Sequence, residues 1–197
     1  HPPELLCGAD PDTGQRQQLA RLFNISVFAD SNEAVEEASV VVLAVKPQAV
    51  STSILEIADS LKRQRPLLVS IAAGIRLASL SKNAGENLPI VRVMPNTPAL
   101  IQAGAAALYA NEHVSNEQRE LSEAIMRSVG IALWLDSEDK LDAVTALSGS
   151  GPAYFFLIME AMEKAAINLG LDENQARLLT LETAFGAAKM AMESNHD

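Results

Sequence analysis

The sequence predicts an α/β fold in which a largely parallel sheet is followed by a second domain made only of helices. Two patterns predict this architecture. Over the first 137 residues, short apolar runs rich in β-branched residues alternate with amphipathic stretches, as in βαβ units. After residue 137 the apolar segments are long and helical, with no strand between them. We therefore expect one domain over residues 1–137 and another over residues 138–197.

Seven apolar runs are candidate strands, at residues 4–7, 25–28, 40–45, 67–71, 90–94, 105–109 and 131–135. The run at 40–45 is apolar on both faces, as expected for a central strand covered by helices on both sides. Strands and helices alternating in this way are typical of a Rossmann-like domain that binds a dinucleotide.

Helices are expected where a polar capping residue precedes an amphipathic stretch. Thr13 precedes a helix at 14–23, and Ser31 or Asn32 precedes one at 33–38. A longer helix is expected over 48–62, and three more over 140–147, 152–169 and 173–192.

The last two of these helices are unusually apolar. Apolar residues over 154–169 cover more than one stripe, and a helix that is apolar nearly all round must be buried. Two or three helices alone cannot bury such a surface. A second subunit is the economical explanation, so we expect a homodimer or a higher homo-oligomer.

Composition excludes several classes of protein. The 15 Lys and Arg against 25 Asp and Glu give a net charge of −10, which argues against a nucleic-acid partner. The longest unbroken apolar runs, at 40–45 and 152–159, are far shorter than the roughly 20 residues of a membrane span, so we expect no membrane segment. The single cysteine, Cys7, and the lack of a Cys/His cluster predict no disulfide, no metal site and a cytoplasmic location.

The Gly-rich fingerprint of dinucleotide-binding domains is absent from this sequence. If residues 4–7 are the second strand of a Rossmann unit, then a first strand, Gly-rich loop and helix of roughly 30 residues would precede them. Asp10 would then follow the second strand, where a carboxylate binds ribose hydroxyls and favours NAD over NADP. The same segment could equally be a turn with a helix N-cap.

Three further segments follow predicted strands, where ligands of open α/β sheets collect. Small residues after the fourth strand would let a flat ring approach the backbone, and Asn96 lies in a rigid loop between two prolines. Each segment also has a structural alternative, namely a solvated charge or a plain turn. The residues are Ala44, Val45, Lys46, Pro47, Ala72, Ala73, Gly74 and Asn96.

A fourth segment joins two predicted helices at the expected domain junction. Its backbone N–H groups could bind a carboxylate at a helix N-terminus, or it could be a flexible turn before Pro152. Its residues are Ser148, Gly149, Ser150 and Gly151. No HExxH or GxSxG motif occurs, and we assign no catalytic residue.

Taken in order, five segments resemble pyrroline-5-carboxylate reductase in its bacterial form. They are AVKP at 44–47, SIAAG at 70–74, MPNTP at 94–98, DAVTALSGSGPAY at 142–154 and GAAKM at 186–190. The resemblance implies hydride transfer from NADPH or NADH to 1-pyrroline-5-carboxylate, giving L-proline, and a helical domain that interleaves with a second subunit.

The resemblance also implies roles for particular residues. It makes Asn32, Ala44, Val45, Lys46, Pro47, Ala72, Ala73, Gly74 and Asn96 cofactor contacts, and it places Ser148 to Gly151 beside the substrate. The family's Gly-rich loop is absent, and its later carboxylate-binding loop would lie beyond Asp197, so we expect these 197 residues alone to be inactive.

Two alternatives remain. One is a reductase resembling β-hydroxyacid dehydrogenases, which would need Lys164 or Lys189 as a catalytic lysine. The other is a non-catalytic nucleotide-binding dimer, which the missing Gly-rich loop favours.

Overall fold

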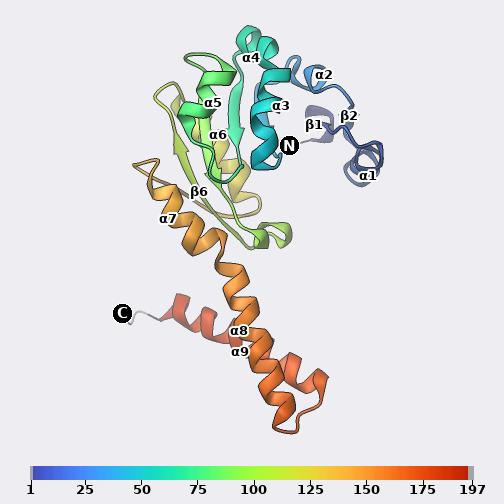
Figure 1. The fold of residues 1–197 in the computed structure, drawn as a ribbon, viewed down its shortest axis with the longest axis vertical. Coiled ribbons are helices and arrows are strands. Elements are labelled where there is room, and N and C mark those ends of the chain that lie inside the picture. The colour runs from blue at the N-terminus through green and yellow to red at the C-terminus, as the bar shows by residue number, and fades with distance from the viewer. Residues whose placement is uncertain (1, 195–197) are drawn as a thin grey trace. The chain divides into compact units, whose positions relative to one another are not determined.

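The computed structural model describes residues 2–194 and divides the chain into two compact units, His1–Ser148 and Gly149–Asp197 (Figure 1). By its contacts, α7 (Lys140–Val144) belongs to the first unit, because it packs on strand β6. Within the described residues, the fold is the α/β sheet followed by helices that the sequence predicts.

The first unit contains a five-stranded sheet in the order β3 (Val40–Leu43), β4 (Leu67–Ser70), β5 (Ile90–Met94), β6 (Gly104–Ala110) and β7 (Gly130–Trp134). All neighbouring pairs are parallel except β5 and β6. The link between those two strands, residues 95–103, is too short for the crossover of a dozen or more residues that parallel strands need. The chain therefore reverses there, through the 3-10 helix η3 (Thr97–Ile101).

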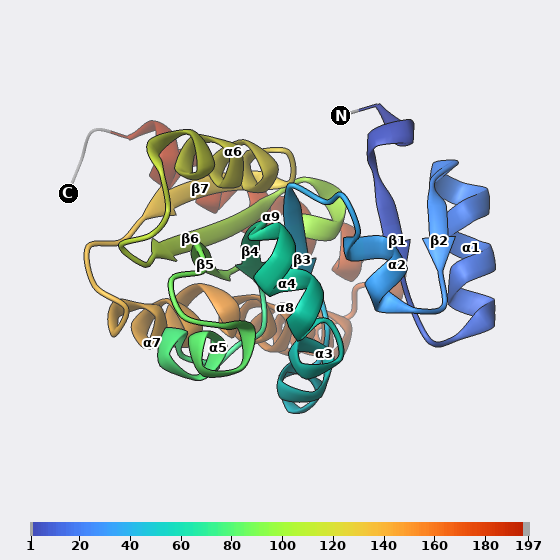
Figure 2. The same ribbon diagram turned by 90° about the horizontal axis from the view of Figure 1, so that it is seen from above.

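Two short strands, β1 (Cys7–Ala9) and β2 (Ser26–Phe28), pair in parallel across α1 (Thr13–Phe23). In the described part of the chain they form a sheet of their own beside the larger one (Figure 2). The strand expected at 4–7 is wrong, because Pro3 starts a 3-10 turn, η1 (Pro3–Leu5), and pairing begins only at Cys7.

The other predicted strands are confirmed, with ends moved by no more than two residues. The expectation that 40–45 is a central strand is wrong for the described chain, where β3 ends the sheet and Val42 is 44% exposed. The strand buried along its whole length is β4 instead.

The first two helices start one and two residues earlier than predicted, and the second ends at Val35 rather than at residue 38. Asp12, not Thr13, caps α1 by accepting a hydrogen bond from Gln15 N. Asp30, not Ser31 or Asn32, caps α2 (Ser31–Val35). In both cases the preceding carboxylate outcompetes the later side chain for the free N–H groups of the first turn.

The single helix expected over 48–62 is broken into η2 (Pro47–Ala49), α3 (Val50–Glu56) and α4 (Ala58–Gln64). At the break, Ile57 has φ −104° and ψ 7°. The Asn32 Nδ2 donates to the Glu56 carbonyl at 3.0 Å, so a side chain replaces one helical hydrogen bond at the kink.

Two helices were not predicted, α5 (Leu77–Ala84) and α6 (Asn116–Arg127). For α6 a signal was present, because Ser115 and Gln118 form a capping box at its start. The helix α5 begins without a side-chain bond from its own capping residue, which leaves little to detect in the sequence.

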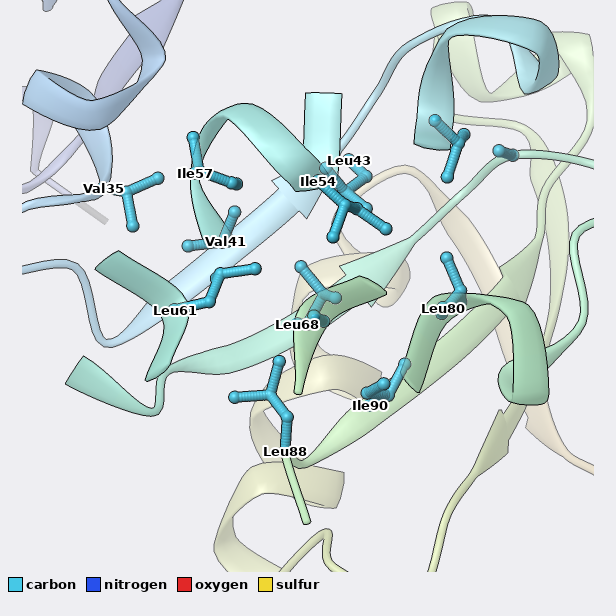
Figure 3. Close-up of a cluster of buried hydrophobic side chains, with 13 residues drawn as sticks. Val35, Val41, Leu43, Ile54, Ile57, Leu61, Leu68, Leu80, Leu88 and Ile90 are labelled. Atoms are coloured by element: carbon cyan, nitrogen blue, oxygen red, sulfur yellow. The ribbon is translucent and has the colours of Figure 1, made fainter. Parts of the chain in front are cut away.

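The core of the first unit lies on both faces of the large sheet. On one face, Leu68 and Ile90 pack with Ile54, Leu61 and Leu80 from α3, α4 and α5 (Figure 3). On the other face, the alternate residues of β4 and β5 pack with β6 and with α6. Because helices cover both faces of this sheet, the ends of its strands remain accessible to a ligand.

The second unit consists of α8 (Gly151–Asn168) and α9 (Glu173–Glu193), which pack against each other and confirm two of the predicted helices. Their apolar side chains remain largely uncovered, with Phe155, Phe156 and Leu157 between 62% and 67% exposed. The sequence predicts that these helices alone cannot bury their apolar surface, and the described chain agrees with this prediction.

The segment at 148–151, for which a flexible turn was one alternative, is helical except for a bend at Ser150. A π-helix over Thr145–Gly149 follows α7 and leads into α8. The resulting stretch Lys140–Asn168 is long and apolar enough to cross a membrane by length and composition. The sequence analysis predicted no membrane segment because it considered only unbroken apolar runs. In the stretch Lys140–Asn168, polar residues interrupt the apolar ones.

A close backbone approach between β6 and β7 yields a prediction about stability. Gly130 has φ 150°, and a Cβ at this position would lie 1.9 Å from the carbonyl oxygen of Gly104. We expect Gly130→Ala to destabilise the protein by about 2 kcal/mol or more, measured by urea denaturation. Gly8→Ala is the control, because its Cβ would meet Ile25 and Val27 at an ordinary 3.9 Å. Equal unfolding midpoints for the two variants would contradict this account.

Candidate functional site

Three consecutive parallel strands end at one edge of the large sheet. The register pairs Leu43 of β3 with Ser70 of β4, and Ser70 with Arg92 of β5. The segments that follow these strands, residues 44–47, 71–76 and 95–97, therefore emerge together, and we call this place the strand-end edge. Ligands of open α/β sheets bind at such an edge.

The segment between β4 and α5, residues 71–76, has the backbone features of a ligand-binding loop. Gly74 has φ 75°, and a Cβ there would find nothing within 4 Å. The neighbouring Ala72 is small and buried, and its N–H lies 3.4 Å from Ser70 Oγ. Apart from its two chain neighbours, no residue fills the space at the Cβ position of Gly74, so a flat ring can approach the backbone there. The residues present thus fit the cofactor that the sequence predicts here.

The segment after β3 places a cation at the same edge. Lys46 precedes η2, which begins at Pro47, and its side chain is exposed. Among residues 2–194 its ammonium group forms no hydrogen bond or ion pair. Val45 beside it is 37% exposed. A free ammonium group at a strand end can bind a phosphate.

Asn96 joins two segments that the sequence assigns to different ligands. Its Oδ1 accepts a hydrogen bond from Ala105 N at 2.8 Å, and its Nδ2 donates to the Ser148 carbonyl at 3.2 Å. The Ser148 Oγ lies 3.4 Å from the same Nδ2. The side chain of Asn96 therefore holds Ser148 and the start of β6 beside the end of β5.

Gly149, Ser150 and Gly151 lie in the second unit, at the start of α8. Ser150 is the N-cap residue of this helix, and Gly151 is buried at its first position. The π-helix that ends at Gly149 is a rare geometry that is frequent at functional sites.

The other two predicted cofactor residues are engaged in local structure. The Asn32 amide bonds to Asp30, to the Glu56 carbonyl and to Ser60, which ties α2 to α4. The Asp10 Oδ1 accepts from Asp12 N at 2.8 Å, so this segment contains the turn and helix cap that were the structural alternative.

A cation of α1, Arg16, also holds this turn. The Arg16 guanidinium donates to the carbonyls of Asp10 and Pro11 at 2.7 and 2.9 Å and to Thr13 Oγ1 at 2.9 Å. It lies one helical turn into α1, beside the predicted ribose site. The Asp10 carboxylate and the Arg16 guanidinium therefore flank one loop with opposite charges.

Sequence reasoning missed a charge cluster behind the strand-end edge. Arg92 of β5 is only 5% exposed, and its Nη1 donates to Glu138 Oε1 at 2.5 Å. Arg76, at the start of α5, pairs with Asp139 and Asp142, and the hydrogen bond that its guanidinium donates to Asp139 raises the pKa of Arg76. The detectable signal was an arginine within the apolar strand IVRVM, because a buried charge requires a partner.

The lysines required by the alternative dehydrogenase hypothesis lie on helix surfaces. Lys164 pairs with Glu160 one turn away, and Lys189 pairs with Glu193. Both side chains are more than half exposed. Within residues 2–194, no three His, Cys, Asp or Glu side chains gather closely enough to hold a metal ion.

Two family models match the chain. One, described as pyrroline-5-carboxylate reductase dimerisation, matches residues 138–197, and the other, described as NADP oxidoreductase coenzyme F420-dependent, matches residues 2–74. The pyrroline-5-carboxylate reductase of Pseudomonas aeruginosa is 53% identical over 94% of this chain and 68% of its own length. That of Pasteurella multocida is 38% identical over 98% and 71%.

Solved structures agree with these matches. A pyrroline-5-carboxylate reductase from Coxiella burnetii has a TM-score of 0.93 and 41% identity, covering 99% of this chain and 72% of its own. The Plasmodium falciparum pyrroline carboxylate reductase with NADP bound has a TM-score of 0.88 and 28% identity, covering 98% and 70%. With this identity over most of both chains, the protein belongs to the pyrroline-5-carboxylate reductase family.

Proposed function

We propose that this protein is a cytoplasmic reductase that acts on 1-pyrroline-5-carboxylate with NADPH or NADH and forms L-proline. Besides family membership, the supporting observation is the hydrogen bond between Asn96 and Ser148. This bond joins the segment predicted to hold the cofactor to the segment predicted to border the substrate. A dehydrogenase acting through Lys164 or Lys189 is disfavoured, because both are paired on exposed helix faces.

The strand-end edge would hold the cofactor largely through backbone groups. We assign this role to Ala44, Val45, Lys46, Pro47, Ala72, Ala73 and Gly74. Lys46 would contact a phosphate, and the open backbone at Gly74 would face a ring. When bound, the cofactor supplies a hydride to the C=N carbon of the cyclic imine. The imine is a good acceptor once protonated, so the protein needs mainly to align it and exclude water.

Binding of the substrate is assigned to Ser148, Gly149, Ser150 and Gly151, with Asn96 holding Ser148 in place. We expect Asn96→Ala to lower kcat/KM for the imino acid by about 100-fold, because removal of the side-chain amide releases Ser148 from the end of β5. Steady-state kinetics on the complete protein would measure this loss.

The matched control for this prediction is Asn111→Ala. Asn111 also accepts from a backbone N–H, that of Ile90 at 3.1 Å, and donates to a carbonyl, that of Leu88 at 2.8 Å. It does so at the opposite end of β5, so its loss should lower stability and leave KM unchanged. Equal kinetic losses in both variants would contradict a specific role for Asn96.

Asp10 bears on the choice between the two cofactors. A carboxylate beside the ribose repels a 2′-phosphate, whereas the Arg16 guanidinium would attract one. We expect Asp10→Ser to raise the ratio of kcat/KM for NADPH over NADH by about tenfold. Asp12→Ser is the control, because it removes the same charge from the same turn and keeps a capping hydroxyl for Gln15 N. A similar shift in both variants would show that only the overall charge of the turn matters.

We further propose that residues 138–197 act as a homodimerisation segment, as the matching family description indicates. The exposed faces of α8 and α9 would then be covered by a second copy of the chain rather than by lipid. A homodimer would give the exposed side chains of Phe155, Phe156 and Leu157, which point to different sides of α8, apolar partners.

Sedimentation of purified protein tests this assembly. We expect Phe156→Glu to weaken self-association about 30-fold, roughly the 2 kcal/mol expected of a central aromatic contact. Leu22→Glu on α1 is the control, because Leu22 is 58% exposed and Phe156 is 62% exposed. Unchanged association of the Phe156 variant would overturn the proposal for this face.

A further inference from the structure

We propose that Glu138 is a positioning residue that holds the loop at 71–76 in place for the cofactor. This inference rests on the proposed function, since it assigns that loop to the cofactor. The carboxylate lies behind the loop and acts through it, without itself belonging to the ligand-facing residues.

Glu138 bridges two elements that are remote from it in sequence. Its Oε1 accepts a hydrogen bond from Arg92 Nη1 at 2.5 Å and another from Leu77 N at 2.7 Å. Leu77 is the first residue of α5, and the N-cap residue Arg76 offers no side-chain acceptor to this helix. The first N–H groups of a helix need acceptors from elsewhere, and a carboxylate is the most favourable kind. Glu138 is therefore the cap of α5.

Hydrogen bonds anchor the loop at 71–76 at its two ends, and between them Ala72 and Ile75 pack against the core. At the first end, Ile71 N donates to the Leu43 carbonyl at 3.3 Å, which continues the pairing of β3 and β4. At the second end, Leu77 N is held by Glu138. Between them, the backbone at Gly74 has open space where a side chain would otherwise pack. Glu138 therefore anchors the end of the loop that leads into α5.

The ion pair with Arg92 fixes the position of Glu138, and thereby of the hydrogen bond to Leu77 N. The side chain of Arg92 is 6% exposed and that of Glu138 20% exposed, so neither can turn to water without leaving the other unpaired. A buried arginine without its carboxylate is strongly unfavourable, which keeps Glu138 in one position. The nearby pairs of Arg76 with Asp139 and Asp142 are more than half exposed and are screened by solvent, so they hold the loop less firmly.

The same anchor also constrains the substrate side of the site. Glu138 precedes α7, and the chain continues from there through the π-helix to Ser148, which Asn96 binds. The positions of the loop at 71–76 and of the segment around Ser148 thus both depend on the Glu138 carboxylate. An error in the position of Glu138 would shift both, and small misplacements of reactants are costly to rate.

Glu138→Ala tests the inference, with Glu123→Ala as the matched control. Glu123 is likewise a partly buried carboxylate, 27% exposed, that pairs with an arginine, Arg127 at 2.7 Å, and accepts from Trp134 Nε1. It lies on α6, away from the loop. Three measurements are made on the complete protein: amide hydrogen exchange, the dissociation constant of NADPH from its own fluorescence, and separate kcat and KM values.

We expect both variants to lose thermal stability, but only Glu138→Ala to raise hydrogen exchange over residues 72–78. Only this variant should also raise the dissociation constant and KM of NADPH, by about tenfold. A purely structural role would lower the active fraction, and hence kcat, while leaving KM and the dissociation constant unchanged. If Glu138→Ala does not fold, Glu138→Asp replaces it, because the shorter side chain keeps the charge for Arg92 but cannot also reach Leu77 N.

The outcomes separate this inference from the proposed function. A wild-type protein that binds NADPH and reduces the imino acid, together with an unchanged KM in the Glu138 variants, overturns the inference alone. A wild-type protein that does not reduce the imino acid overturns the proposed function, whatever the exchange data show. Raised exchange at 72–78 with weaker NADPH binding supports the inference.

Discussion

The parallel pairing of β3, β4 and β5 is the constraint on which the remaining structure depends. Because these strands run in the same direction in close register, the segments that follow them meet at one edge. Helices cover both faces of the sheet, so the backbone groups at this edge are the ones left accessible. The short reversal between β5 and β6 then brings Asn96 back toward the chain that leads into the helical unit. Each element of the candidate site thus follows from strand direction.

Local patterns in the sequence predict most of this architecture. Short apolar runs locate the strands from residue 25 onward, and long, largely apolar stretches locate α8 and α9. The errors arise where local signals compete. Two acidic residues, Asp12 and Asp30, each precede another good capping residue and take the cap in its place. The break at Ile57 could not be predicted, because it depends on Asn32, which is distant in sequence.

The site was predictable only in part, and for the same reason. Segments at strand ends can be found from the strands themselves, which is how Lys46, Gly74 and Asn96 were identified. The charge cluster behind them depends on contacts between residues far apart in the chain. Arg92 and Glu138 are separated by 46 positions, and Leu77 and Glu138 by 61. An arginine in an apolar strand indicates that a partner exists, but only the fold identifies it.

The two helices of the second unit bury very little of their own apolar surface, with Ala176 and Thr180 among the few buried side chains of α9. If a second copy of the chain covers them, as proposed above, their ordered state is subject to mass action. Dilution would then act on this protein as a denaturant does, beginning with α8 and α9. The midpoint of its thermal unfolding would then depend on protein concentration and would rise as that concentration increases.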